Sequence, residues 1–291
     1  MNKQNGHTTA AVRISPELNL FQETVIRLLL FAIYIYFEIK DPFIRQINPD
    51  EMWLYKNPRT DSYVPLTALY PSVFGFAAVV FLVYYFRTGD FNDFKSAWLG
   101  LTLACSLNGV ITHSIKVAVG RPRPDFYWRC FPDGVMNADM VCSGDSRTVM
   151  DGRKSFPSGH ASFAFAALAF ISCYLCAKLH VFTERGRGQS WRLLTAGAPL
   201  LAATLVAISR TCDYHHHWQD VTVGSLIGLV EAYLCYRQYY PPMESRFGFL
   251  PYMGDTKSQS TSKTKSESPI VNSDPDSKML LGSEDKDNKW T

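Results

Sequence analysis

Three short polar segments carry most of the residue types in this chain that could do chemistry on a phosphate group. They read KVAVGRPRP at 116–124, FPSGH at 156–160 and SRTCDYHHHWQD at 209–220. Lys116, Arg123 and Arg210 supply cationic donors that match an anion with several exposed oxygens. Ser158 and Gly159 open a predicted helix, and the N–H groups at a helix start bind anions readily. The pattern therefore predicts a phosphate-binding site.

The third segment also carries a histidine with a carboxylate partner. His216 and Asp220 are four residues apart, so in a helix that has begun by His216 their side chains share a face and Asp220 can hold the imidazole. The other ring nitrogen is then free to attack phosphorus and form a phosphohistidine. His160 can protonate the leaving alkoxide and afterwards deprotonate the attacking water. The two histidines need opposite starting protonation states, so we expect their surroundings to move their pKa values apart.

Other interpretations of these residues stay open at this point. Three consecutive histidines at 215–217, with a cysteine and an aspartate nearby, suit a metal site, although neighbouring helical residues point in different directions and do not converge on one ion. His217 lies three residues from Asp220 and is geometrically acceptable in place of His216. Basic residues can also simply anchor helix ends to lipid headgroups, but this explains neither FPSGH nor the His and Asp pair.

Six mostly apolar runs approach the roughly 17–25 residues that a helix needs to cross a bilayer. They cover 21–39, 66–86, 96–115, 160–177, 193–208 and 221–236. The first is the weakest because it carries Glu23, Arg27 and Glu38, although charges near helix ends can reach the interface. A soluble helical bundle is disfavoured, because the runs are too uniformly apolar for helices with one buried face. We predict an all-α integral membrane protein with six transmembrane helices.

Basic residues indicate the orientation of these helices. The loop between the fourth and fifth runs carries Lys178, Arg185, Arg187 and Arg192 against Glu184, and cytosolic loops are enriched in Lys and Arg. Both termini are then cytosolic, and the active site lies at the non-cytosolic ends of helices 3 to 6. The loop 116–154 conflicts with this rule because it is also basic, but its Asp residues nearly balance the charge and several of its cations serve the anionic ligand.

Two cysteines, Cys130 and Cys142, fall in this non-cytosolic loop, where oxidation is permitted. The sequence allows a disulfide between them but does not decide whether it forms.

The remaining composition sets the domain organisation and excludes one partner class. The 29 Lys and Arg against 26 Asp and Glu give a net charge of +3, too nearly balanced to indicate a nucleic-acid partner. We expect a cytosolic segment 1–20, a six-helix domain 21–240 and a cytosolic tail 241–291, whose Ser, Lys, Asp and Thr content predicts disorder. The oligomeric state is left open and a homo-oligomer is allowed.

Taken together, the three segments resemble the signature of the type 2 phosphatidic acid phosphatase (PAP2) superfamily, also called lipid phosphate phosphatases. That signature is Lys, six residues, Arg-Pro; then Pro-Ser-Gly-His; then Ser-Arg, five residues, His, three residues, Asp. Here it is complete, and its spacing selects Arg123 rather than Arg121. The sequence is more similar still to the phospholipid phosphatase 4 and 5 branch, through stretches such as DEMWLYKNP, GRPRPDFYWRCFPDG and GRKSFPSGH.

The resemblance implies a phosphoric monoester hydrolase that needs neither magnesium nor another cofactor. The implied substrates are phosphorylated glycerolipids: phosphatidic acid, diacylglycerol pyrophosphate and lysophosphatidic acid. The implied roles are His216 as nucleophile, His160 as acid and base, Asp220 as the residue that orients the nucleophile, and Lys116, Arg123, Ser158, Gly159 and Arg210 as the phosphate site. The implied location is the endoplasmic reticulum, Golgi or plasma membrane, with a lumenal or extracellular active site.

Two other functional classes are weighed against this one. Vanadium haloperoxidases resemble the same signature, but they are soluble. A membrane protein that binds or transports phospholipids without hydrolysing them is the stronger alternative, and the intact nucleophile argues against it.

Overall fold

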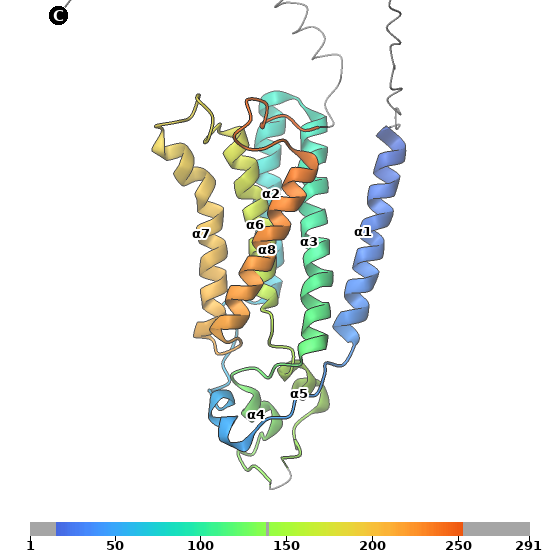
Figure 1. Ribbon diagram of the computed structural model, residues 1–291, viewed down its shortest axis with the longest axis vertical. Helices are drawn as coiled ribbons and strands as arrows, with labels where there is room; N and C mark the ends of the chain where they lie inside the picture. Colours follow the sequence, from blue (N-terminus) through green and yellow to red (C-terminus); the bar gives the residue numbers. More distant parts are fainter. Residues whose placement is uncertain (1–15, 138–139, 253–291) are drawn as a thin grey trace, which may run out of the picture. The chain divides into compact units, whose positions relative to one another are not determined.

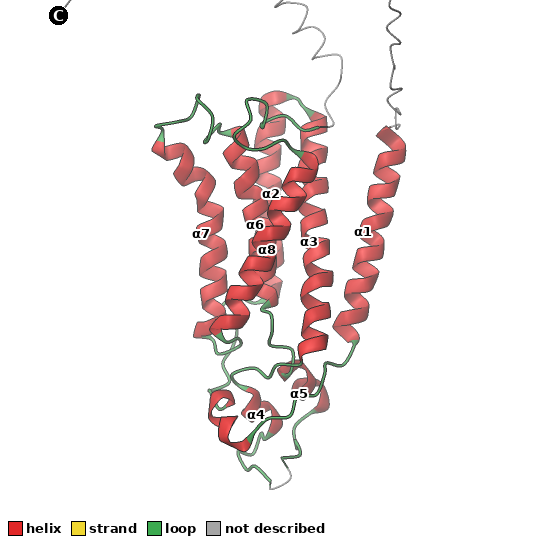
Figure 2. Ribbon diagram, viewed as in Figure 1, coloured by secondary structure: helices red, strands yellow, loops and turns green. Residues whose placement is uncertain are grey.

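The computed structural model describes residues 16–137 and 140–252, and every regular element within these ranges is helical (Figure 2). The predicted all-α class is thus confirmed. The long helices are α1 (Pro16–Ile39), α2 (Leu66–Thr88), α3 (Phe91–Val119), α6 (Gly159–Lys178), α7 (Ser190–Cys212) and α8 (Trp218–Tyr239). The short ones are η1 (Pro49–Tyr55), α4 (Phe126–Cys130) and α5 (Ser146–Gly152). Expectations for 1–15 and 253–291 concern residues outside the described part.

The long helices run side by side, and the short helices gather at one end of them (Figure 1). We call η1, α4, α5 and the loops that join them, residues 40–65 and 120–157, the cap. The loop between α6 and α7, which carries the basic residues used for orientation, lies at the opposite end of the bundle (Figure 1).

Four of the long helices are apolar enough over enough residues to cross a membrane: α1, α2, α6 and α7. The helices α3 and α8 are equally long but carry buried polar groups. In the middle of the bundle, the Asn108 amide donates to the Glu231 carboxylate at 2.8 Å, and Ser162 donates to Asn108 at 3.2 Å. Thr112 donates to Ser162 at 3.0 Å. Polar side chains inside a membrane protein face the bundle interior and pair with one another, as these do.

The helix α6 is the centre of the bundle and packs against α3, α7 and α8. Its contact with α8 depends on glycine, because a Cβ on Gly224 would lie 2.6 Å from the carbonyl oxygen of Ser158. Small residues allow helix backbones to approach closely in membrane proteins. This close approach fixes the N-terminal end of α6 against the first turns of α8. Predicted site residues lie at the N-terminal ends of both helices.

At the opposite end of the bundle, an ion pair joins α3 to α6. The Lys178 ammonium lies 2.6 Å from Asp93, and the hydroxyls of Tyr174 and Tyr240 donate to the same carboxylate at 2.8 and 2.9 Å. Removing Asp93 from water is therefore compensated by three donors, as a buried charge requires.

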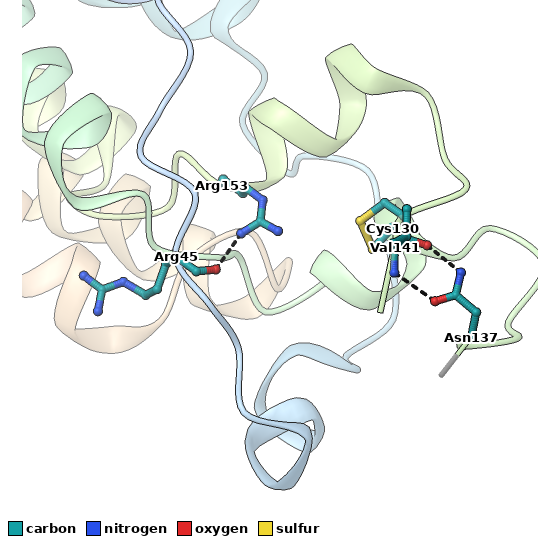
Figure 3. The surroundings of a disulfide bond; sticks show 6 residues. Arg45, Cys130, Asn137, Val141 and Arg153 are labelled. Carbon is teal, nitrogen blue, oxygen red and sulfur yellow. Dashed lines mark hydrogen bonds between the residues drawn. A yellow bond between two sulfur atoms is a disulfide. The ribbon is translucent and has the colours of Figure 1, made fainter. Parts of the chain in front are cut away.

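The cap has a small apolar core of its own. Its buried members are Met52, Tyr55, Phe126, Tyr127, Cys130, Phe131 and Val149. Cys130 and Cys142 form a disulfide, which settles the pairing that the sequence left open (Figure 3). Beside it, Asn137 and Val141 exchange two hydrogen bonds of 2.8 Å, and Arg153 donates to the carbonyl of Arg45 at 2.9 Å (Figure 3). The disulfide and the Asn137 bonds close the loop between residues 130 and 142, and the Arg153 bond joins residues 120–157 of the cap to residues 40–65.

We expect the disulfide to stabilise the protein measurably. A covalent link across a loop of this length stabilises by about 3 kcal/mol in the chain-entropy account, so the double variant Cys130→Ser, Cys142→Ser should unfold on the order of 5–10 °C lower. Differential scanning fluorimetry in detergent measures this. Cys212→Ser removes a free, exposed thiol and serves as the matched control; equal melting temperatures of the two variants would contradict the prediction.

Candidate functional site

A cavity of about 140 Å³ lies where the cap meets the ends of α1, α2, α3 and α6, and we call it the polar cavity. Its lining residues are Tyr34, Glu38, Leu66, Tyr70, His113, Lys116, Arg123, Asp151, Lys154, Gly159, His160 and His216. Five of the eight predicted site residues are thus brought together around one space. The other three, Ser158, Arg210 and Asp220, lie behind this lining.

His216 stands in the loop between α7 and α8 and is 4% exposed. The sequence argument required a helix that had begun by His216, and this condition is not met, because α8 begins at Trp218 and His217 is its N-cap. The histidine is held instead by its backbone N–H, which donates to the Arg210 carbonyl at 3.0 Å. Its Nδ1 still lies 3.7 Å from Asp220 Oδ2. The two side chains are therefore neighbours as expected, although the backbone at His216 is a loop and not a helix.

Ser155 fills the gap between these two side chains. Its hydroxyl donates to Asp220 Oδ2 at 2.6 Å and lies 3.5 Å from His216 Nδ1. Ser155 is fully buried, and its own N–H donates to the Arg121 carbonyl at 3.0 Å. The sequence reasoning did not single this residue out; its one signal was its position directly before FPSGH.

Asp220 accepts more hydrogen bonds than its pairing with His216 requires. Arg121 Nη1 lies 2.6 Å from Oδ1, and the backbone N–H of His217 donates to Oδ2 at 3.1 Å. Its own carbonyl accepts from the backbone N–H of Ser158 at 2.9 Å. The two arginines of GRPRP therefore separate: Arg123 lines the polar cavity, whereas Arg121 supports the carboxylate behind it.

The start of α6 forms one wall of the polar cavity. Ser158 is the N-cap, and its side chain accepts from the Ala161 N–H at 3.4 Å. Gly159 and the Lys116 side chain are neighbours, since a Cβ on Gly159 would lie at the ordinary contact distance of 3.6 Å from Lys116 Cε. His160 follows on the same turn, and its Nε2 is buried with no hydrogen-bond partner within the described chain.

Cations line the wall opposite α6, and each is held by an acceptor of the cap. Lys116 Nζ donates to the Lys154 carbonyl at 2.8 Å. Arg123 donates to the Asp151 carbonyl at 3.2 Å and to its carboxylate at 3.0 Å. Arg129 reaches the same carboxylate at 2.9 Å. Burial favours the neutral form of Asp151, but the charges of Arg123 and Arg129 outweigh this effect. The pKa of Asp151 is therefore lower than its ordinary value, and the carboxyl group stays charged.

Arg210 does not line the polar cavity. It is buried, with its guanidinium 2.6 Å from Asp213 and a further hydrogen bond to Ser62. Its Nε has no partner among the described residues. The expectation that Arg210 is one of the cations around the phosphate therefore has no direct geometric counterpart here.

The neighbours of His216 are engaged elsewhere. His215 Nδ1 lies 2.9 Å from the Asp213 carbonyl oxygen, and His217 Nε2 lies 3.3 Å from that of Pro122. His217 also packs edge-on against Tyr55. The three imidazoles thus point to three different places, and His216 is the one that lines the polar cavity.

Burial lowers the pKa of the His216 imidazole well below its ordinary value, because the charged form loses its hydration. The pairing with Asp220 opposes this shift, while the charges of Lys116 and Arg123 add to it. His216 is therefore neutral at physiological pH. A neutral ring whose Nδ1 faces Ser155 and Asp220 leaves Nε2 with a lone pair.

The rest of the cavity wall comes from residues outside the three segments. His113 Nε2 lies 3.1 Å from the Glu38 carboxylate, and Lys154 Nζ donates to the Glu38 carbonyl at 2.6 Å. These contacts attach the end of α1 to α3 and to the cap. Nothing in the sequence marked them, because they depend on how α1 is placed beside α3.

Comparison with known proteins gives a consistent picture. The model of the PAP2 superfamily matches residues 96–244, which include all three polar segments. Lipid phosphate phosphatase 2 of Arabidopsis thaliana is 44% identical over 235 residues, covering 78% of this chain and 80% of the relative. The probable diacylglycerol pyrophosphate phosphatase 1 of Schizosaccharomyces pombe is 32% identical and covers 78% and 83%. Diacylglycerol pyrophosphate phosphatase 1 of Saccharomyces cerevisiae is 40% identical over 165 residues, covering 54% and 56%. No solved structure matches the chain.

The neutral state of His216 can be checked directly. A group whose folded pKa is lowered stays unprotonated as the pH falls through its ordinary value, so His216 should remain neutral at pH 6.5 and below. Its ring ¹⁵N shifts in histidine-labelled protein, assigned by their loss in His216→Gln, report this between pH 5 and 8. A titration midpoint at or above about 6.5, the ordinary histidine value, would contradict the prediction.

Proposed function

The chain belongs to the PAP2 superfamily, and from this premise we propose that it is a membrane lipid phosphatase. It hydrolyses the phosphomonoester of phosphatidic acid to diacylglycerol and phosphate, and it also takes diacylglycerol pyrophosphate and lysophosphatidic acid. The observation that carries this proposal is one cavity that unites His216, His160, Lys116 and Arg123 at the cap end of a bundle with membrane-spanning helices. The names of the relatives, which are lipid phosphate and diacylglycerol pyrophosphate phosphatases, support the substrate class.

In the first step, His216 Nε2 attacks the phosphorus, and the bond from phosphorus to the lipid oxygen breaks. Asp220, with Ser155 between the two side chains, holds Nδ1 and stabilises the positive charge that develops on the ring. The lowered pKa of His216 supports this role, because the unprotonated ring is the nucleophile. The product is a phosphohistidine, and no metal ion takes part.

His160 acts first as the general acid and then as the general base. It lines the same cavity with an unpartnered Nε2, and it donates a proton to the leaving alkoxide as diacylglycerol forms. It then takes a proton from water, whose oxygen attacks phosphorus and releases His216.

Lys116 and Arg123 bind the phosphate oxygens, with Gly159 and the first N–H groups of α6 on the opposite wall. Ser158 shapes this turn as its N-cap, and its N–H is engaged by the Asp220 carbonyl in the free protein. Arg210 lies behind the cavity wall, so in this proposal its side chain must shift to contact the phosphate, with its unpartnered Nε as the available donor.

For the membrane arrangement, we propose that α1, α2, α3, α6, α7 and α8 all span the bilayer as one domain of residues 21–240. Both termini, with segments 1–20 and 241–291, are cytosolic. The polar cavity is lumenal or extracellular, in the endoplasmic reticulum, Golgi or plasma membrane. The disulfide in the cap supports this side, since disulfides persist outside the cytosol. The basic loop at the opposite bundle end fits the cytosol.

The first test is phosphate release from phosphatidic acid in detergent micelles with excess EDTA. His216→Ala should lower the rate by about a thousandfold or more, because the nucleophile is lost. His217→Ala, whose backbone N–H still bonds Asp220, should stay within about tenfold, the order of effect of a lost helix cap. Release abolished by EDTA would overturn the metal-free mechanism, and no release by the wild type would favour a binding or transport protein.

The orientation can be tested with engineered N-glycosylation sites in microsomes. Asp133→Asn with Val135→Thr creates an acceptor in an exposed part of the cap, and Ser258→Asn creates one in the tail. We expect a mobility shift, reversed by endoglycosidase H, for the cap site and none for the tail site. The opposite pattern would place the polar cavity on the cytosolic side.

A further inference from the structure

A second hollow, of about 480 Å³, lies between α1, α2 and α3 beside the polar cavity, and we call it the groove. Tyr34 of α1 and Tyr70 of α2 line both hollows. The Tyr34 ring lies on α3, since a Cβ on Gly109 would be 3.2 Å from it, and Tyr70 packs edge-on against Phe163 with ring centroids 4.6 Å apart. The two tyrosines form the neck where the groove meets the polar cavity.

One face of α3 runs through both hollows. Thr102, Ser106 and Gly109 line the groove, and His113 and Lys116 line the polar cavity. These positions are three or four residues apart and so form one stripe on a helix. The fourteen residue-to-residue steps from 102 to 116 correspond to about 21 Å at roughly 1.5 Å per residue. Half of the hydrocarbon thickness is about 15 Å, so the groove extends from the phosphate site deep into the bilayer.

The groove is apolar and faces the lipid. Phe31 and Ile35 of α1 line it and are 58% and 37% exposed, and Tyr70 is 38% exposed. Phe74 of α2 adds a further aromatic wall. In a bilayer these exposed side chains contact acyl chains, so a lipid can enter the groove from the side without leaving the membrane.

We propose that the groove binds an acyl chain of the substrate while the phosphate of the same molecule occupies the polar cavity. The inference rests on the proposed function and adds the binding site for the lipid tail. The occupant is the substrate rather than another membrane lipid, because the groove adjoins, at Tyr34 and Tyr70, the cavity that His216 lines. The glycerol backbone then lies at the neck, between Tyr34 and Tyr70.

A bulky side chain in the groove should slow the hydrolysis of substrates with long acyl chains more than that of substrates with short ones. Ser106 lines the groove, whereas Ala202 is an exposed residue of α7, so Ser106→Trp and Ala202→Trp make a matched pair. With kcat/KM measured for dioleoyl and dihexanoyl phosphatidic acid, Ser106→Trp should lower the dioleoyl to dihexanoyl ratio by about tenfold or more, and Ala202→Trp should leave it within about twofold.

The outcomes separate this inference from the proposed function. An unchanged ratio in Ser106→Trp, with dihexanoyl hydrolysis retained, overturns the groove proposal and leaves the phosphatase intact. A wild type that hydrolyses neither lipid overturns the proposed function itself.

A second measurement does not depend on how Ser106→Trp folds. Phosphatidic acid with a diazirine in mid-chain, bound to His216→Ala and irradiated, should label residues 31–35 and 102–109. Excess dioleoyl phosphatidic acid should compete for this label, and dioleoyl phosphatidylcholine should not. Equal competition by both lipids, or labelling mainly on α7, would identify a general lipid contact and overturn the proposal.

Discussion

The buried carboxylate of Asp220 is the constraint on which the rest of the site depends. It is fully inaccessible to water, so its charge is tolerable only while donors surround it. Those donors come from three separate parts of the chain: Arg121 after α3, Ser155 before α6, and the His217 N–H at the start of α8. The Asp220 carboxylate therefore has its hydrogen bonds only when these three parts of the chain come together. The same arrangement places His216 at the polar cavity.

A second electrostatic balance holds the cations of the polar cavity in place. Lys116 and Arg123 both line this cavity, and like charges in a poorly hydrated space repel. The Lys154 carbonyl and the Asp151 carboxylate take up their donors meanwhile, and Arg129 holds Asp151 in place. The cap therefore supplies the acceptors that hold these cations, and its own apolar core and disulfide hold the cap. In the proposed mechanism, a substrate phosphate replaces these acceptors.

The sequence predicted the helical class and the grouping of most site residues, because both follow from local patterns. Apolar runs indicate helices whatever their neighbours, and the spacing around Lys116, Pro157 and His216 matches the family signature. The missed features depend on tertiary structure. The start of α8 at Trp218 is set by the capping exchange between His217 and Asp220, which competes with the helix that simple spacing suggested. Ser155 and Arg121 act through Asp220, so no contact with an expected ligand marked them. Arg210 was assigned by its charge and by the family signature, and Asp213 and Ser62 hold it behind the cavity wall.

The placement of α1 has a mechanical consequence. Among the described helices its backbone lies beside α3 alone. Side-chain contacts fasten it at its middle, where Arg27 bonds Leu99 and Tyr239, and at its C-terminal end, where Glu38 contacts His113 and Lys154. A helix attached along one side can tilt without disturbing the packing of α6 against its neighbours. Transmembrane helices tilt in response to bilayer thickness. A change in bilayer thickness that tilted α1 would therefore change its distance from α2 and α3, the helices that line the groove with it.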